Sequence, residues 1–77
     1  MASSLPSLSS VKVVKALKKA GFAEVRQKGS HLILINDSTG RRVTIPMHSG
    51  RDIKKPLLRK IIEVEALMSV EEFLNLL

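Results

Sequence analysis

The sequence predicts an α+β sandwich in which helices cover one face of a three-stranded antiparallel sheet. Apolar residues recur at helical spacing near both ends of the chain, and three short strand-like segments separated by turn residues lie between them. A chain of 77 residues can close only one hydrophobic core. We therefore expect a single domain over residues 10–77, preceded by a flexible, Ser-rich segment at residues 1–9.

The first helix is expected to begin at Ser10, a good N-cap residue, and to end at Gly21, whose conformational freedom suits a helix end. Apolar residues predict its buried stripe, which comprises Val13, Val14, Ala16, Leu17 and Ala20. The opposite side is cationic and carries Lys12, Lys15, Lys18 and Lys19. The pattern indicates an amphipathic helix with a basic outer face.

Three strands are expected at residues 23–28, 31–36 and 41–46, separated by Gly29-Ser30 and by residues 37–40. Alternation predicts that the core-facing side chains are Val25 and Gln27 in the first strand and Val43 and Ile45 in the third. The middle strand is apolar on both faces at residues 32–35, so its second face is either covered or forms an exposed apolar patch. We favour an exposed patch that a partner covers.

A polar connector at residues 48–52 precedes a helix in which Pro56 suits the first turn. The apolar stripe of this helix is predicted to comprise Leu57, Leu58, Ile61 and Ile62. Ser69 and Glu72 have the spacing of a capping box, which predicts a short last helix that carries Phe73. One helix, three strands and two helices, in that order, are typical of the double-stranded-RNA-binding type of α+β sandwich.

The charge of the chain favours a nucleic acid as its partner. Thirteen Lys and Arg against seven Asp and Glu give a net charge of +6, and all of the basic residues lie between Lys12 and Lys60. Such a surface attracts phosphates and releases counterions on binding. A basic face that serves only solubility is the alternative.

Composition also excludes several classes of protein and site. The absence of cysteine removes disulfides and thiolate zinc sites and suits the reducing cytoplasm. No segment reaches the ~20 apolar residues that span a bilayer, and no secretory signal is recognisable, so we expect a soluble, cytoplasmic protein without membrane contact. The two histidines and scattered acids form no metal-binding motif, and we expect neither a metal nor another cofactor.

His31 is the first candidate for catalysis. It follows the turn Lys28-Gly29-Ser30, and Arg26 and Lys28 are expected to hold phosphates near it. Imidazoles titrate near neutral pH, so one can accept the proton of a 2′-hydroxyl or protonate a leaving 5′-oxygen. RNA supplies its own nucleophile, so such an enzyme needs no metal. From the residues alone, an ordinary structural position at the start of a strand remains the alternative.

His48 is a secondary candidate, because acid–base cleavage of RNA can use two histidines in complementary roles. It follows Pro46-Met47, just beyond the third expected strand. The alternative is a loop residue whose hydrogen bonds orient the connector.

Four stretches of the chain resemble the HicA mRNA-interferase toxins, and the resemblance extends over about residues 11–77. They are Leu-Lys-Lys-Ala-Gly-Phe at 17–22, Val-Arg-Gln-Lys-Gly-Ser-His at 25–31, Gly-Arg-Arg-Val-Thr-Ile-Pro-Met-His at 40–48 and Ser-Val-Glu-Glu-Phe-Leu at 69–74. The resemblance implies a domain with the double-stranded-RNA-binding fold that acts as a ribosome-independent endoribonuclease, with His31 catalytic. The start of the helix after the connector departs from the family's Lys-Pro-Gly-Thr, since this chain has Lys54-Lys55-Pro56-Leu57.

The resemblance further implies mRNA as the substrate, a HicB-type antitoxin as the protein partner and a toxin–antitoxin hetero-oligomer. The residues expected to bind RNA or its phosphates are Arg26, Lys28, Gly29, Ser30 and Arg42. A non-catalytic RNA-binding module would use the same surface and is the principal alternative. A DNA-binding regulator is disfavoured, because no helix-turn-helix spacing is present.

Overall fold

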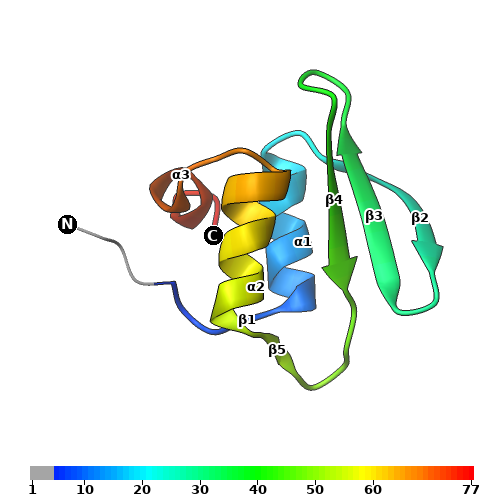
Figure 1. Cartoon of the computed structure of the whole chain (residues 1–77), viewed down its shortest axis with the longest axis vertical. Helices are drawn as coiled ribbons and strands as arrows, with labels where there is room; N and C mark the ends of the chain where they lie inside the picture. The colour runs from blue at the N-terminus through cyan, green and yellow to red at the C-terminus, as the bar shows by residue number, and fades with distance from the viewer. Residues whose placement is uncertain (1–4) are drawn as a thin grey trace.

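The computed structural model describes residues 5–77, and it arranges them as two helical segments and a short third helix beside a three-stranded sheet (Figure 1). The elements in chain order are β1 (Leu8–Ser9), α1 (Ser10–Lys19), β2 (Ala23–Lys28), β3 (His31–Asn36), β4 (Arg41–Pro46), β5 (Asp52–Ile53), α2 (Lys55–Lys60), a π-helical turn (Ile61–Glu65) and α3 (Val70–Leu74). No helix within residues 5–77 is long and apolar enough to cross a membrane.

The main sheet is antiparallel, with strand order β2-β3-β4, and its three strands have the bounds that the sequence predicts. Figure 1 shows α1 and α2 side by side next to β4, with β2 at the far edge of the sheet. Val43 and Ile45 of β4 are fully buried, and Leu32 and Leu34 of β3 are no more than 5% exposed. The predicted fold class, an α+β sandwich of the double-stranded-RNA-binding type, is confirmed.

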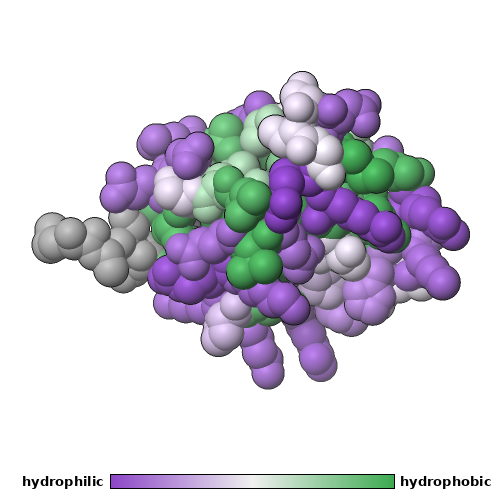
Figure 2. All heavy atoms as spheres, turned by 45° about the horizontal axis from the view of Figure 1, so that its top comes forward, coloured by the Kyte–Doolittle hydropathy of each residue, from purple (hydrophilic) through white to green (hydrophobic). Residues whose placement is uncertain are grey.

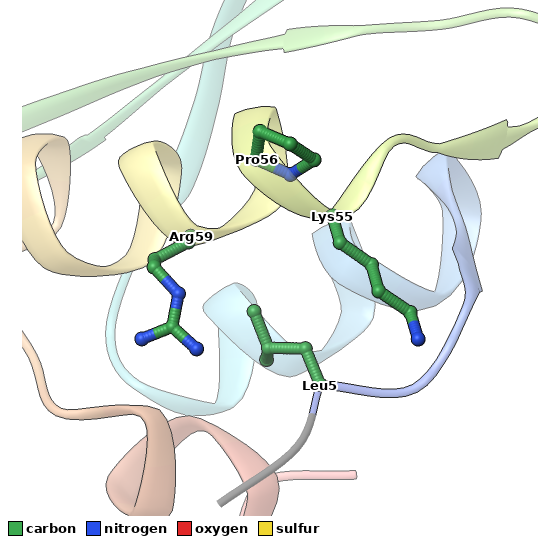
Figure 3. A pocket seen from close by; sticks show the side chains of 4 residues that line it. All are labelled: Leu5, Lys55, Pro56 and Arg59. Carbon is green, nitrogen blue, oxygen red and sulfur yellow. The ribbon is translucent and has the colours of Figure 1, made fainter. Parts of the chain in front are cut away.

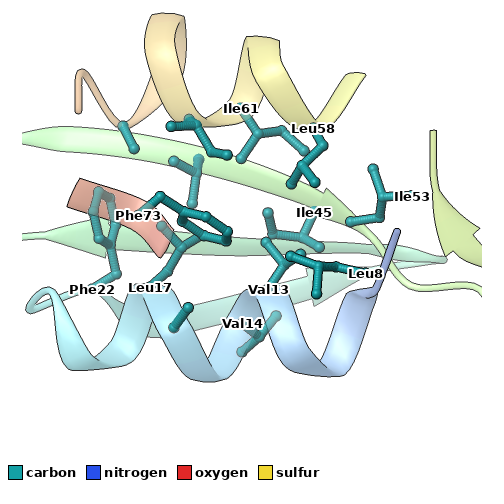
Figure 4. Close-up of a cluster of buried hydrophobic side chains, with 14 of the residues drawn as sticks. Leu8, Val13, Val14, Leu17, Phe22, Ile45, Ile53, Leu58, Ile61 and Phe73 are labelled. Carbon is teal, nitrogen blue, oxygen red and sulfur yellow. The ribbon is translucent and has the colours of Figure 1, made fainter. Parts of the chain in front are cut away.

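The core lies between the helices and one face of the sheet. Figure 4 shows apolar side chains of α1 and of the α2 segment pointing toward one another, with Ile45 and Phe73 between them. The largest fully buried side chains are Phe73, Leu17, Leu34, Ile45, Leu58, Ile61 and Ile62. All the helices therefore bury their apolar stripes on the same side of the sheet, which leaves its other face open.

Helix α1 begins one residue earlier than predicted. Ser9, not Ser10, is the N-cap, and its hydroxyl accepts a hydrogen bond of 3.3 Å from the N–H of Lys12. Ser10 is buried in the first turn and donates to the carbonyl of Pro46 at 2.5 Å, which joins the helix start to the end of β4. The predicted stop is confirmed, because Gly21 follows the C-cap with φ +105°.

The second helical segment differs from the predicted stripe at one position. Leu58, Ile61 and Ile62 are buried, but Leu57 remains 39% exposed because it lies on the outer side of α2. The chain then leaves the helix through Leu67, which has φ +53° and is 62% exposed. The capping box of α3 is confirmed, with the hydroxyl of Ser69 accepting from the N–H of Glu72 at 3.0 Å.

The segment before α1 is not the flexible lead-in that composition predicts. Leu5 and Leu8 are buried in the core, and Leu8–Ser9 pairs with Asp52–Ile53 in a second, two-stranded sheet. Burial of two leucine side chains offsets the loss of chain entropy. The prediction therefore fails for residues 5–9, and its remainder, residues 1–4, lies outside the described part of the chain.

The predicted core face of β2 is also wrong, since every residue of this strand is exposed and Val25 is 55% exposed. A β-bulge between Glu24 and Arg26 interrupts the alternation that the prediction assumed. The bulge leaves Glu24 opposite Leu34 on the helical side of the sheet, where its carboxylate forms an ion pair with Lys18 of α1. Gln27 pairs with Leu32 on this same side of the sheet, but no helix covers it and it is exposed.

The second face of β3 is not the exposed apolar patch that we favoured from sequence. Ile33 is only 8% exposed although it lies outside the main core. Its register partners on the open face are Arg26 of β2 and Thr44 of β4. Side chains of the flanking strands, whose stems are apolar, therefore cover Ile33 within the chain.

Gly21→Ala is expected to destabilise the domain more than Gly40→Ala. Both glycines have positive φ, but a Cβ at Gly21 would lie 3.2 Å from the amide nitrogen of Asn36, whereas a Cβ at Gly40 would meet nothing within 4 Å. The Asn36 amide cannot move freely, because it donates to the carbonyl of Ala20 at 3.2 Å. The strain of placing an alanine at positive φ costs about 1 kcal/mol in either variant, so the contact with Asn36 makes the difference. Chemical denaturation of both variants measures the difference, and equal losses would contradict the contact at Asn36.

Candidate active site

A two-residue turn joins β2 to β3 and positions His31. Lys28 and His31 are the last register pair of the hairpin, and Gly29 between them has φ +60°. Positive φ at the first central residue is what a type II′ turn requires, and glycine adopts it without strain. His31 is therefore held at the first position of β3, directly across from Lys28.

Backbone and side-chain hydrogen bonds hold this turn on both sides. The side-chain amide of Gln27 donates to the carbonyl of Gly29 at 3.1 Å. The N–H of Met47, just after β4, donates to the carbonyl of Ser30 at 2.6 Å. The turn is consequently tied to its own hairpin and to the connector that follows β4.

The register of the sheet sets which side chains share the open face with His31. Lys28 is the partner of His31, and Arg26 is the partner of Ile33, two residues further along β3. Opposed Cβ atoms lie about 5 Å apart and diagonal ones about 7–8 Å apart. Long Lys and Arg side chains at these positions can reach a phosphate that contacts the imidazole.

No carboxylate of residues 5–77 neutralises these cations. The ion pairs found in this part of the chain are Lys18 with Glu24, on the helical side, and Arg59 with Glu63 within one helical segment. Arg26, Lys28 and His31 are all exposed. The surface beside His31 is thus positively charged and open to an anionic ligand. Figure 2 shows hydrophilic side chains over much of the surface it presents, with apolar residues in separate groups.

The structure does not bring every predicted site residue to His31. Arg42 lies on the same open face but pairs with Ile35, four residues along β3, which is about 13 Å from His31. Gly29 is exposed and has open space where a Cβ would be, whereas Ser30 is half-buried. The compact group is therefore Arg26, Lys28 and His31 with the turn between the strands.

His48 lies at the same end of the sheet as His31. It follows Met47, whose N–H bonds to Ser30, and its side chain is exposed. It lines two neighbouring hollows of about 140 and 210 Å³. The other residues that line one or the other include Val11, Arg51, Lys54 and Leu57, which sequence reasoning missed because they come from α1, the connector and the start of α2. No local motif marks such a grouping.

A larger hollow of about 440 Å³ lies between the N-terminal segment and α2. Figure 3 shows Lys55 and Arg59 extending on either side of Leu5, with Pro56 on the first turn of the helix. Its lining carries two cations but no side chain that transfers protons near neutral pH. Nor do any three His, Asp or Glu residues within 5–77 form a group able to hold a metal ion.

The chemistry available around His31 on the open face is therefore one imidazole beside two cationic side chains, Arg26 and Lys28. This combination can hold a phosphodiester and move a proton to or from it. It offers no side-chain nucleophile of its own next to His31 apart from the half-buried Ser30.

Comparison with known families connects this geometry to one of them. A family model described as the HicA toxin of bacterial toxin–antitoxin systems matches residues 11–65. The matched stretch contains all three strands of the main sheet and both histidines. A comparison with curated proteins finds no match. Because the family model covers more than half of the chain, this protein belongs to the HicA toxin family.

Proposed function

We propose that this toxin is a metal-independent endoribonuclease that cleaves mRNA, with His31 as its general acid/base. The observation that carries the proposal is the exposed position of His31 directly across from Lys28, on a sheet face with no carboxylate partner for Arg26 or Lys28 among residues 5–77. Family membership supplies the toxin role.

In the proposed reaction the 2′-oxygen of RNA attacks the adjacent phosphorus and loses its proton, while the departing 5′-oxygen gains one; His31 carries out one of these two transfers and water the other. The P–O5′ bond breaks, which leaves a 2′,3′-cyclic phosphate and a free 5′-hydroxyl. Lys28 and Arg26 hold the phosphate and stabilise the charge that develops on its oxygens. Arg42, further along the same face, binds a more distant phosphate of the strand.

Incubation of the purified protein with an end-labelled transcript in EDTA tests the proposal. We expect fragments that end in 2′,3′-cyclic phosphate, because neither the nucleophile nor the proton transfer requires a metal. A salt-sensitive mobility shift without fragments would instead identify a non-catalytic RNA-binding module. Fragments that appear only when Mg²⁺ is restored would contradict the metal-independent mechanism.

Membership of a toxin–antitoxin family implies an antitoxin partner. We propose that this partner is a HicB-type protein that covers the open, basic face and forms a hetero-oligomer with the toxin. Both the mRNA substrate and the lack of cysteine favour the cytoplasm as the place of action.

Lys28→Ala is expected to weaken RNA binding and to lower its salt dependence, because one phosphate contact is lost. For single strands the slope of log K against log salt falls by about 0.7 per contact. Lys15→Ala is the matched control, since Lys15 is also exposed but lies on α1, on the helical side of the sheet. Titration of an uncleavable 2′-O-methyl RNA at several salt concentrations measures the affinity and its salt dependence for each variant. Equal slopes for the two variants would contradict a phosphate site at Lys28.

A further inference from the structure

His48 lines two neighbouring hollows; both have apolar side chains in their walls, and the larger also has two cations. The smaller is bounded by Ser9, Val11 and residues 47–50, and the larger by Arg51, Lys54 and Leu57 among others. Their volumes of about 140 and 210 Å³ lie below the ~300 Å³ at which pockets for drug-sized ligands begin. Each therefore suits one planar group rather than a whole small-molecule ligand.

Two exposed apolar side chains flank His48. Val11, in the first turn of α1, is 55% exposed and lines the smaller hollow, and Leu57 of α2 is 39% exposed and lines the larger. Arg51 and Lys54 add positive charge beside them, against the single carboxylate of Asp52. Proteins bind single-stranded nucleic acid without reading its sequence by stacking bases on a ring next to a basic track, and His48 is the ring available here.

The sheet register limits the distance between His48 and His31. His31 pairs with Pro46, and His48 follows Pro46 by two residues, so the two Cα atoms lie no more than about 13 Å apart. Two hydrogen bonds hold the chain just before the connector, from the N–H of Met47 to Ser30 and from the hydroxyl of Ser10 to Pro46. These bonds tie the start of the connector, and with it His48, to the end of the sheet that carries His31.

We infer that His48 is a base-stacking platform for a nucleotide that flanks the scissile linkage of single-stranded RNA, and not a second acid/base of the cleavage. This inference rests on the proposed nuclease function and assigns the position of the flanking nucleotide. Its base stacks on the imidazole against Val11 or Leu57, and its phosphate lies near Arg51 and Lys54. His48 is accordingly a positioning residue, while His31 performs the proton transfer.

The first test is a binding experiment that needs no cleavage. The probe is a 2′-O-methyl oligouridylate with one central 2-aminopurine, whose fluorescence falls when its base stacks. We expect quenching by the wild-type protein and by His48→Phe, but not by His48→Ala, for which the Kd rises about 5- to 150-fold. His31→Ala should quench like the wild type. Absence of quenching by the wild-type protein would overturn the inference without touching the role of His31.

The second test separates stacking from proton transfer by kinetics. If His48 stacks, His48→Phe retains kcat within a few-fold of the wild type, and His48→Ala mainly raises KM. If His48 transfers protons, both variants lose kcat alike, which would overturn the inference. Val11→Ser and Val64→Ser form a matched pair, because both valines are more than half exposed but only Val11 lines a hollow beside His48. Only Val11→Ser should raise KM.

Discussion

His31→Ala is expected to abolish RNA cleavage while leaving the domain folded. The variant removes the imidazole nearest to the proposed phosphate site, and acid–base catalysis contributes about 10²- to 10⁴-fold in rate. Because the side chain is exposed, its removal creates no cavity, and surface substitutions usually change stability by less than about 0.5 kcal/mol. The result separates a catalytic histidine from one that merely starts a strand.

Three measurements on the same preparation make this prediction decisive. Fragment formation from a labelled transcript gives the rate, thermal unfolding gives the stability, and titration of an uncleavable RNA gives the affinity. We expect loss of the first and near-constancy of the other two. His31→Gln controls for size and polarity and should be as inactive as alanine. Growth arrest on expression of His31→Ala would refute the assignment.

Phe73→Ala is expected to unfold much of the protein population at growth temperature. Phe73 is fully buried, and large-to-small changes of buried Phe cost about 3–5 kcal/mol. A domain of 77 residues is stable by only about 4–12 kcal/mol in total. The melting temperature should therefore fall by at least about 12 °C, at 4–8 °C per kcal/mol for a domain of this size.

Leu77→Ala is the matched control for this experiment, because Leu77 lies four residues along the chain from Phe73 but is 50% exposed. It should shift the melting temperature little. The comparison also tests whether α3, which lies beyond the matched family region at residues 11–65, belongs to the same cooperative unit. A Phe73→Ala protein that melts like the wild type would show that α3 packs independently of the core.

The strands and the last helix could be predicted because their signals are local. Turn residues at Gly29-Ser30 bound two of the strands, and the Ser69–Glu72 capping box specifies the start of α3 within four residues. One error arose where a distant segment competes for the same side chain. Ser10 is a good cap by type, but its hydroxyl bonds to Pro46, so Ser9 takes the cap.

In the candidate site, too, only the part that depends on local sequence could be predicted. A two-residue turn makes Lys28 and His31 cross-strand neighbours whatever the rest of the fold does. The distance of Arg42 from them depends on the register between β3 and β4, which the sequence leaves undetermined. The surroundings of His48 depend on α1, the connector and α2 meeting at one corner, and no spacing in the chain indicates that meeting.

The sequence by itself determines the element order, the charge and the hairpin that carries His31. Periodicity and turn chemistry act over a few residues, and the charge follows from composition. Only the tertiary structure decided that Leu5 and Leu8 join the core, that a bulge turns Glu24 toward Lys18 and that Ile33 is covered within the sheet. Burial of a side chain is a property of everything packed around it, and those neighbours come from segments far apart along the chain.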